Sequence, residues 1–245
     1  MSQIAWLGPN DSFPNPLQKP DPDPNVPGLI AVSERIYPGQ LLQAYQRGIF
    51  PWYSDNQPVL WWSPDPRMVL QPQHFKCSES LQKVIRQFCQ DSQSQLLVDT
   101  DFGAVIRACA TSIRKDQDGT WITHEIIDAY TTFHEQGHAH CIALQEQGEL
   151  IGGLYCVALG GMVFGESMFS RKPNASKIAL AALSAWCIEH GMAMIDCQQE
   201  TAHLRSLGAV PISRAQFLDQ LQISLNQSNI ELPWTFDKQI LTHWL

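Results

Sequence analysis

The second half of the chain alternates between a helical and an extended pattern of apolar residues. Between residues 123 and 135, apolar side chains recur at the spacing of one helix face, and Gly137 follows where such a helix would end. Three apolar segments come next, at 140–146, 150–159 and 162–169. Short glycine-containing stretches separate them, as in tight hairpin turns. The pattern therefore predicts a helix followed by an antiparallel meander.

A long helix and one more strand are predicted after the meander. Asn174 is a suitable N-cap for a helix that reaches about residue 190, and residues 192–198 form a further extended segment. Ser213 and Gln216 have the spacing of a capping box, which should open a final helix. This order of meander, helix and strand resembles that of GNAT-type acyltransferases.

The first half of the chain has shorter and more mixed elements. Residues 1–38 are rich in proline, aspartate and asparagine and predict an extended arm. The predicted helices span 39–47, 78–89 and 99–113, and the predicted strands span 59–62 and 67–70. The expected fold class is α+β. A small mixed N-terminal domain with its arm (1–72) precedes a GNAT-like catalytic domain with a mainly antiparallel sheet (73–245).

Composition narrows the class of protein. The 245 residues contain seven scattered cysteines without a CxxC pair, which favours reduced thiols over disulfides or structural zinc. The sequence contains no run of eighteen apolar residues and no apolar N-terminal run behind a basic segment. We therefore expect a cytoplasmic protein that does not enter the membrane, and we expect it to be a monomer.

The net charge of −8 has the wrong overall sign for a protein that binds a polyanion. Residues 67–115 are locally basic, with seven lysines and arginines against four acidic residues. If nucleic acid binds, Lys83 and Arg86 in this stretch are the candidate phosphate contacts. A solvated helical face would explain the same charges, so both interpretations stay open.

The densest group of candidate functional residues lies on two predicted strands. Glu166 belongs to the 162–169 segment, and Asp196 and Gln198 end the 192–198 segment. Because strand neighbours two apart point the same way, we expect Asp196 to orient the amide of Gln198, with Glu166 approaching from another strand. Each side chain could instead cap a turn or form an ion pair at a strand end.

Two tryptophans lie in loop or boundary settings. Trp52 and Trp121 occur where a core role is less expected than for Trp186, and aromatic faces of this kind can stack on nucleic-acid bases. Packing remains the alternative for both, because the large apolar area of tryptophan favours burial. Of Trp61 and Trp62, which share a predicted strand, one should face inward.

The sequence gives little support for a metal site or for a serine or cysteine nucleophile. His134, His138 and His140 lack a nearby cysteine or carboxylate that would complete a ligand set, so we expect no metal. Residues 165–169 lack the second glycine of the GxSxG motif, which disfavours serine hydrolysis. Cys197 should point away from its polar neighbours and pack in the core.

An acetyl-CoA transferase is a serious competitor. The strand order suits it, and the helix that begins at Asn174 could receive a pyrophosphate. Residues 170–176 before and at the start of this helix contain a proline and no glycine, so close approach of the backbone to a pyrophosphate is not encoded in the usual way. A GNAT-type scaffold with another acyl donor fits both observations.

Seven motifs occur in one order along the chain: AYQRGIFPW (44–52), WWSPDPR (61–67), GTWIT (119–123), GHAH (137–140), GESMFSR (165–171), NASK (174–177) and IDCQ (195–198). Together they resemble the leucyl/phenylalanyl-tRNA–protein transferase family, over most of the chain. The resemblance implies transfer of Leu or Phe, less often Met, from aminoacyl-tRNA to the α-amine of proteins with N-terminal Arg or Lys. This transfer marks those proteins for N-end-rule degradation.

The resemblance implies neither a metal nor a cofactor. An α-amine has an ordinary pKa of about 7.7–8.0, so part of it is already nucleophilic near neutrality. Catalysis can then consist largely of positioning. A basic acceptor also suits the acidic net charge, since complementary potentials assist encounter. A binding module with the same fold but without turnover would differ from the enzyme only at Glu166, Asp196 and Gln198.

The resemblance also implies roles for particular residues. Asp196 would orient Gln198, Gln198 would guide the attacking amine and stabilise developing charge, and Glu166 would hold the acceptor or the donor's amino group. The residues implied at the terminal adenosine of the tRNA are Trp52 and Trp121, with Tyr45 and Tyr130 nearby. The residues implied around the transferred side chain are Leu154, Val163, Met168, Leu180 and Ile195.

Overall fold

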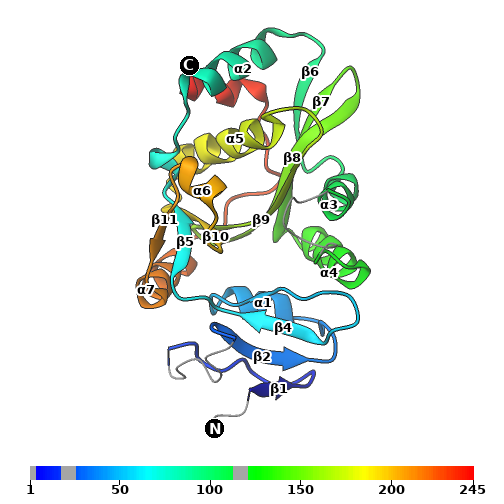
Figure 1. The fold of residues 1–245 in the computed structure, drawn as a ribbon, viewed down its shortest axis with the longest axis vertical. Helices are drawn as coiled ribbons and strands as arrows, with labels where there is room; N and C mark the ends of the chain where they lie inside the picture. The colour runs from blue at the N-terminus through cyan, green and yellow to red at the C-terminus, as the bar shows by residue number, and fades with distance from the viewer. Residues whose placement is uncertain (1–3, 18–25, 113–120) are drawn as a thin grey trace.

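The protein contains two β-sheets that follow one another along the long axis of the molecule (Figure 1). The computed structural model describes residues 4–17, 26–112 and 121–245. The smaller sheet has the strand order β1-β2-β4-β3, and the larger sheet has the order β11-β5-β10-β9-β8-β7-β6. Of the candidate functional residues, Glu166, Asp196 and Gln198 belong to the larger sheet.

The smaller sheet lies near the N-terminus. It consists of β1 (Ala5–Leu7), β2 (Leu29–Ser33), β3 (Phe50–Pro51) and β4 (Val59–Trp62), accompanied by α1 (Gln40–Tyr45). The predicted arm at residues 1–38 thus contributes two strands, and β2 is buried along its whole length. The prediction of an arm was wrong here, because β2 pairs with β1 and β4 and such pairing between distant residues leaves no local signal in the sequence. Residues 20–24 lie outside the described residues. Trp61 is buried and Trp62 is partly exposed, as the alternation of a strand requires.

The larger sheet confirms the predicted meander. Its strands are β5 (Arg67–Leu70), β6 (Ser94–Val98), β7 (Ala139–Glu146), β8 (Glu149–Leu159), β9 (Met162–Ser170), β10 (Met194–Gln198) and β11 (Val210–Ile212). Neighbouring strands pair antiparallel except β9 and β10, which are parallel. Gln147 and Gly148 join β7 to β8 with φ of 52° and 81°, the conformation that a two-residue hairpin turn favours.

Helices cover both faces of the larger sheet (Figure 1). The helices are α2 (Glu79–Gln90), α3 (Phe102–Ala110), α4 (His124–Glu135), α5 (Ala175–Glu189), α6 (Ala202–Ser206) and α7 (Arg214–Leu225), with the 3₁₀ turns η1 (Pro72–His74) and η2 (Lys238–Trp244). Along β7, Cys141 packs toward the core that contains α3 and α4, whereas Ile142 packs toward the core that contains α2, α5 and η2. The sheet therefore separates two apolar cores, and the α+β fold class is confirmed.

The helix α5 connects the two parallel strands and explains why they can be parallel. Parallel neighbours need a crossover connection, usually a helix. The long apolar surface of α5 is buried on nearly all sides, between the sheet and η2. The order of meander, helix and parallel strand matches the GNAT-like expectation. The division after residue 72 stays a prediction, and β5, which precedes that residue, already pairs in the larger sheet.

Candidate functional site

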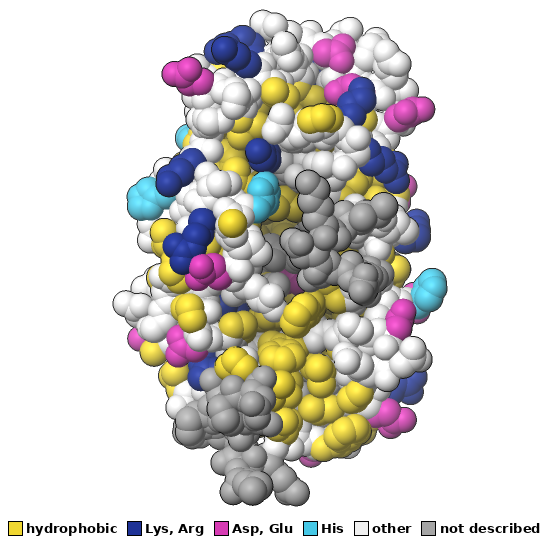
Figure 2. All heavy atoms as spheres, in the orientation of Figure 1, with side chains coloured by type: hydrophobic (Ala, Val, Ile, Leu, Met, Phe, Trp, Pro, Cys, Tyr) yellow, Lys and Arg dark blue, Asp and Glu magenta, His cyan; other side chains and the backbone are white. Residues whose placement is uncertain are grey.

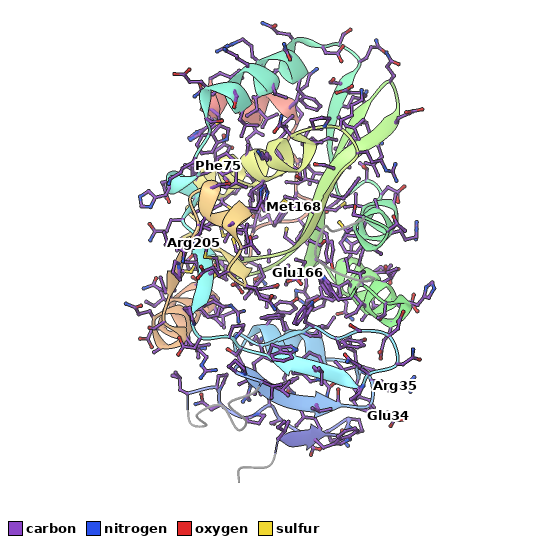
Figure 3. All side chains as sticks on the ribbon, in the orientation of Figure 1. Glu34, Arg35, Phe75, Glu166, Met168 and Arg205 are labelled. Carbon is purple, nitrogen blue, oxygen red and sulfur yellow. The ribbon has the colours of Figure 1, made fainter. Side chains whose placement is uncertain are left out.

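The side chains of Glu166 and Gln198 meet at the junction of β9 and β10. The parallel register pairs Asp196 with Phe164, which places Gln198 beside Glu166. Nε2 of Gln198 donates a hydrogen bond of 2.9 Å to Oε1 of Glu166. Figure 3 shows Glu166 where the larger sheet approaches the N-terminal sheet. The predicted approach of Glu166 to Gln198 from a neighbouring strand is what the structure contains.

Asp196 contacts Gln198 through the main chain. The pairing of β10 with β5 is irregular between these two residues, and Gln198 has a left-handed φ of 62°. Oδ1 of Asp196 accepts the backbone N–H of Gln198 at 2.9 Å. The carboxylate therefore contacts the backbone of Gln198, while the side-chain amide bonds to Glu166, because the bulge breaks the simple alternation of the strand. Cys197 packs against the apolar core that contains α5, as predicted, and it also lines both cavities.

Arg67 is a residue that the sequence analysis missed. Its Nε and Nη2 donate to Oδ1 and Oδ2 of Asp196 at 2.8 and 2.6 Å, and its exposed fraction is 1%. The guanidinium also lies over the rings of Phe50 and Phe217. Arg67 belongs to the basic 67–115 stretch, but its burial and its bonds to Asp196 leave it unavailable to a phosphate. An arginine at the start of an apolar strand segment was the available signal, because buried charges need partners.

Two tyrosines lie behind Glu166. The Tyr130 hydroxyl donates to Oε2 of Glu166 at 3.2 Å, and the hydroxyls of Tyr45 and Tyr130 are hydrogen-bonded to each other. Both rings are fully buried. Burial and the neighbouring Glu166 charge raise the pKa of both hydroxyls well above the ordinary value, so both stay protonated. This chain of hydroxyls connects α1 of the N-terminal region with α4 and β9.

Glu166 is the titratable group of this cluster. Burial raises its pKa to about 7, while hydrogen bonds from Tyr45, Gln198 and Tyr130 act in the opposite direction and nearby Asp196 acts in the same direction as burial. A carboxyl group with such a pKa is partly protonated near neutrality and can accept or release a proton there. Burial also raises the pKa of Cys197, which leaves its thiol protonated and weakens it as a nucleophile.

A small apolar cavity of about 110 Å³ opens beside Glu166. Four of the five residues predicted around the transferred side chain line it, namely Leu154, Met168, Leu180 and Ile195, and Leu183 and Leu204 complete the apolar wall. Val163 is fully buried and is not among the lining residues. Met168 lies two residues beyond Glu166 on β9 (Figure 3). The cavity therefore has an apolar interior with one carboxyl group at its edge.

A larger cavity of about 550 Å³ adjoins the small one. Trp52 and Trp121 both line it, as do Gln198 and His203. The residues that line both cavities are Glu166, Ser167, Met168, Cys197 and Leu204. Because Glu166 lines both cavities and Gln198 lines the larger one, this polar pair lies close to an apolar pocket and to two aromatic rings. On the surface, hydrophobic side chains gather over α1 and β4 (Figure 2).

The remaining candidates lie apart from these cavities. Lys83 and Arg86 are exposed on α2, at the end of the molecule opposite the N-terminal sheet (Figure 1), whereas Arg114 and Lys115 fall outside the described residues. Nδ1 of His140 bonds to Asp99, and Nδ1 of His134 bonds to the carbonyl of Ala139. Across 4–17, 26–112 and 121–245, no three His, Cys, Asp or Glu side chains are grouped as a metal site would require.

Known proteins match nearly the whole chain. The sequence matches the leucyl/phenylalanyl-tRNA protein transferase family over residues 69–222 and the N-terminal domain of that transferase over residues 35–65. A leucyl/phenylalanyl-tRNA–protein transferase of Cupriavidus necator is 54% identical over 241 residues, which cover 98% of this chain and 96% of the relative. One from Ralstonia pickettii is 49% identical over 241 residues, which cover 98% of this chain and 97% of the relative.

Solved structures show weaker likeness. A GCN5-related N-acetyltransferase from Kribbella flavida has a TM-score of 0.37 and 13% identity, and covers 75% of this chain and 64% of its own. L-PGS from Bacillus licheniformis has a TM-score of 0.38 and 15% identity, and covers 71% of this chain and 56% of its own.

The meander and the α5 crossover place two adjoining cavities at β9 and β10 of an α+β fold, and the similar sequences make its class that of an aminoacyltransferase. The matches to known sequences then assign the family. The chain belongs to the leucyl/phenylalanyl-tRNA–protein transferase family. This family transfers Leu or Phe from aminoacyl-tRNA to protein N-termini. Among the described residues, no helix combines the length and apolar character that crossing a membrane requires.

Proposed function

We propose that this protein transfers Leu or Phe, and less often Met, from aminoacyl-tRNA to the α-amine of proteins with N-terminal Arg or Lys, and so marks them for N-end-rule degradation. The observation that carries the proposal is the pair of adjoining cavities with Glu166 and Gln198 beside them. One cavity is small and apolar, and the other is larger and lined by two tryptophans. An aminoacyl-adenosine has the same two parts, a side chain and a base, joined by an ester.

The small cavity is suited to the transferred side chain. An apolar cavity of about 150 Å³ binds benzene in another protein, so about 110 Å³ is of the order of one Leu or Phe side chain. The wall residues Leu154, Met168, Leu180 and Ile195 offer apolar contact to such a side chain. In this proposal, the pocket takes side chains with an unbranched Cβ, as Leu and Phe have.

The larger cavity is suited to the terminal adenosine of the tRNA. Trp52 and Trp121 line it and can contact the base by stacking, a mode of binding that single-stranded nucleic acids use widely. Tyr45 and Tyr130 support this region from behind, because they are buried and bonded to Glu166 rather than open to the cavity. The ester carbonyl then lies near the shared residues of the two cavities, next to Gln198.

The reaction at this point is an aminolysis. The α-amine of the acceptor attacks the carbonyl carbon, the bond from that carbon to the 3′-oxygen breaks, and the tRNA leaves with a free 3′-hydroxyl after the amine's proton has been passed on. The amide of Gln198 can guide the amine and stabilise the developing charge. Glu166, with a pKa of about 7, can bind the acceptor's α-amine in its ammonium form and accept a proton from it. Asp196 contributes by fixing the backbone of Gln198.

The acceptor and the tRNA body approach from outside the cavities. A net charge of −8 favours an acceptor with a cationic first residue. Exposed Lys83 and Arg86 on α2 are the proposed contacts with tRNA phosphates. Because aminoacyl-tRNA is used in the cytoplasm, we expect the protein to act there. We expect the protein to be a monomer.

A peptide series tests the proposed acceptor. The purified protein is mixed with radiolabelled Phe-tRNA or Leu-tRNA and with peptides that differ only at the first residue: Arg, Lys, Ala or N-acetyl-Arg. Label is expected in the Arg and Lys peptides alone. An equally labelled Ala peptide would contradict the acceptor preference, and unlabelled peptides beside intact charged tRNA would contradict the activity itself.

A further inference from the structure

The guanidinium of Arg67 joins the N-terminal region to the reactive end of β10. Besides its two bonds to Asp196, Arg67 donates from Nη1 to the carbonyl of Gly48 at 3.1 Å. The rings of Phe50 and Phe217 lie 4.8 and 4.5 Å from its central carbon. Arg67 and Asp196 are 1% and 0% exposed. The side chain is therefore held by bonds in its plane and by aromatic rings that contact it.

Both oxygens of Asp196 are occupied by this arrangement. Oδ2 accepts Nη2 of Arg67, and Oδ1 accepts both Nε of Arg67 and the backbone N–H of Gln198. Both oxygens are therefore bonded to this protein's own groups, and Asp196 is 0% exposed. Asp196 also lines neither cavity, whereas Gln198 lines the larger one. The bond from the Gln198 N–H to Asp196 is therefore a direct connection between the ion pair and a residue of the larger cavity.

The backbone of Gln198 needs such support. A non-glycine residue with a φ of 62° is uncommon, and its conformation has to be stabilised by surrounding contacts. The bond from the Gln198 N–H to Asp196 supplies a contact at the irregular position of β10. Because of this conformation, the Gln198 side chain is directed to Glu166, with 2.9 Å between Nε2 and Oε1. The bonds thus run without interruption from Arg67 to Glu166.

We propose that Arg67 is a positioning residue for the transfer reaction: through Asp196, it holds the bulge that directs the Gln198 amide to the reacting carbonyl. This inference rests on the proposed function. Arg67 touches neither cavity and is not a catalytic residue. Its loss should lower kcat and leave the KM for aminoacyl-tRNA nearly unchanged, because Trp52 and Trp121 are unaffected. A displacement of about 1 Å in a reacting group can reduce the rate on the order of 100-fold.

The test replaces the whole ion pair. Removing one partner leaves a buried charge alone and endangers folding, whereas replacing both with apolar residues of similar volume is often tolerated. The double substitution Arg67→Met with Asp196→Leu should fold, lose on the order of 100-fold in kcat, and keep the KM for aminoacyl-tRNA within about twofold. Arg214→Met is the matched control, because Arg214 is also a buried arginine, bonded to the carbonyl of Ser63. It should keep the wild-type kcat.

Combination with Gln198→Ala separates positioning from general structural support. If Arg67 acts through Gln198, the double substitution should reduce kcat no further in a protein that already carries Gln198→Ala. Independent, multiplying losses would overturn the proposal, as would a wild-type kcat for the folded double variant. If the double variant does not fold, Arg67→Lys takes its place, since it keeps the charge and loses the planar fork. A wild-type kcat for folded Arg67→Lys would then overturn the proposal.

A second readout does not depend on catalysis. The side-chain amide signals of Gln198 in ¹⁵N-labelled protein are assigned by their absence in Gln198→Ala. These signals should shift in the Arg67 and Asp196 double variant, or in Arg67→Lys, and stay unchanged in Arg214→Met. Unchanged signals in the double variant would overturn the positioning role. If the wild-type protein transfers nothing to any peptide, the proposed function fails, while the amide signals still decide whether Arg67 holds Gln198.

Discussion

Replacing Glu166 with glutamine should make the protein more stable at alkaline pH and less active. Glu166 has a pKa of about 7 in the folded protein, against an ordinary value of 4.5. Between these values the folded protein keeps a proton that the unfolded chain has released. The free energy of unfolding therefore falls as pH rises from 4.5 to 7, and this contribution stays lost above 7. The uncharged amide of the Glu166→Gln variant avoids the loss.

The magnitude follows from the two pKa values. Each pH unit between 4.5 and about 7 lowers the free energy of unfolding by about 1.36 kcal/mol, which amounts to about 3 kcal/mol in all. Glu166 is partly exposed to the cavity, and solvent there makes this value an upper bound. In a protein of this size, about 1 kcal/mol corresponds to a Tm change of about 2–4 °C. The Tm advantage of Glu166→Gln should therefore grow by at most roughly 12 °C.

Scanning calorimetry of both proteins between pH 4.5 and pH 8 measures this difference. The gap in Tm should widen from pH 4.5 to about 7 and then stay constant. Tyr130→Phe provides a second test. The Tyr130 hydroxyl favours the ionised carboxylate of Glu166, so its removal should raise the pKa of Glu166 and move the pH at which the Tm gap stops widening to a higher value. A gap that is the same at every pH would show that Glu166 titrates at its ordinary pKa, and the reasoning would be refuted.

Three further predictions concern the donor. Trp52→Ala should raise the KM for aminoacyl-tRNA about 5- to 150-fold in steady-state transfer assays, since stacking on a base contributes about 1–3 kcal/mol; an unchanged KM would remove Trp52 from the adenosine site. Leu180→Phe narrows the small cavity and should lower kcat/KM for Phe-tRNA more than for Leu-tRNA, whereas an unchanged ratio would place the side chain elsewhere. Lys83→Glu with Arg86→Glu should raise the KM for aminoacyl-tRNA and weaken its salt dependence, and equal binding across salt would exclude α2.

The sequence was informative where the signal is local. The hairpin at Gln147-Gly148 and the apolar segment that forms β7 follow from residues within a few positions of one another. The strand at Ser94–Val98 was missed, because it is a short edge strand whose first residues are polar. The approach of Glu166 to Gln198 could be predicted because both lie on strands around one crossover helix.

The backbone at Gln198 could not be predicted in the same way. Its left-handed conformation depends on Asp196, and Asp196 is bound by an arginine 129 positions earlier in the chain. Strand periodicity assumes regular pairing and contains no information about such a distant partner. The roles of Tyr45 and Tyr130 were likewise hidden, because only the packing of α1 against α4 brings their hydroxyls to Glu166.

The central claim is that the two cavities hold one aminoacyl-adenosine with its carbonyl beside Gln198. The most direct measurement is a crystal structure with a phenylalanyl-adenosine analogue in which a stable amide replaces the ester. The account predicts the adenine against Trp52 and Trp121, the phenyl ring in the cavity lined by Met168 and Leu180, and the carbonyl within hydrogen-bond reach of the Gln198 amide. A phenyl ring outside that cavity, or a carbonyl on the far side from Gln198, would contradict it.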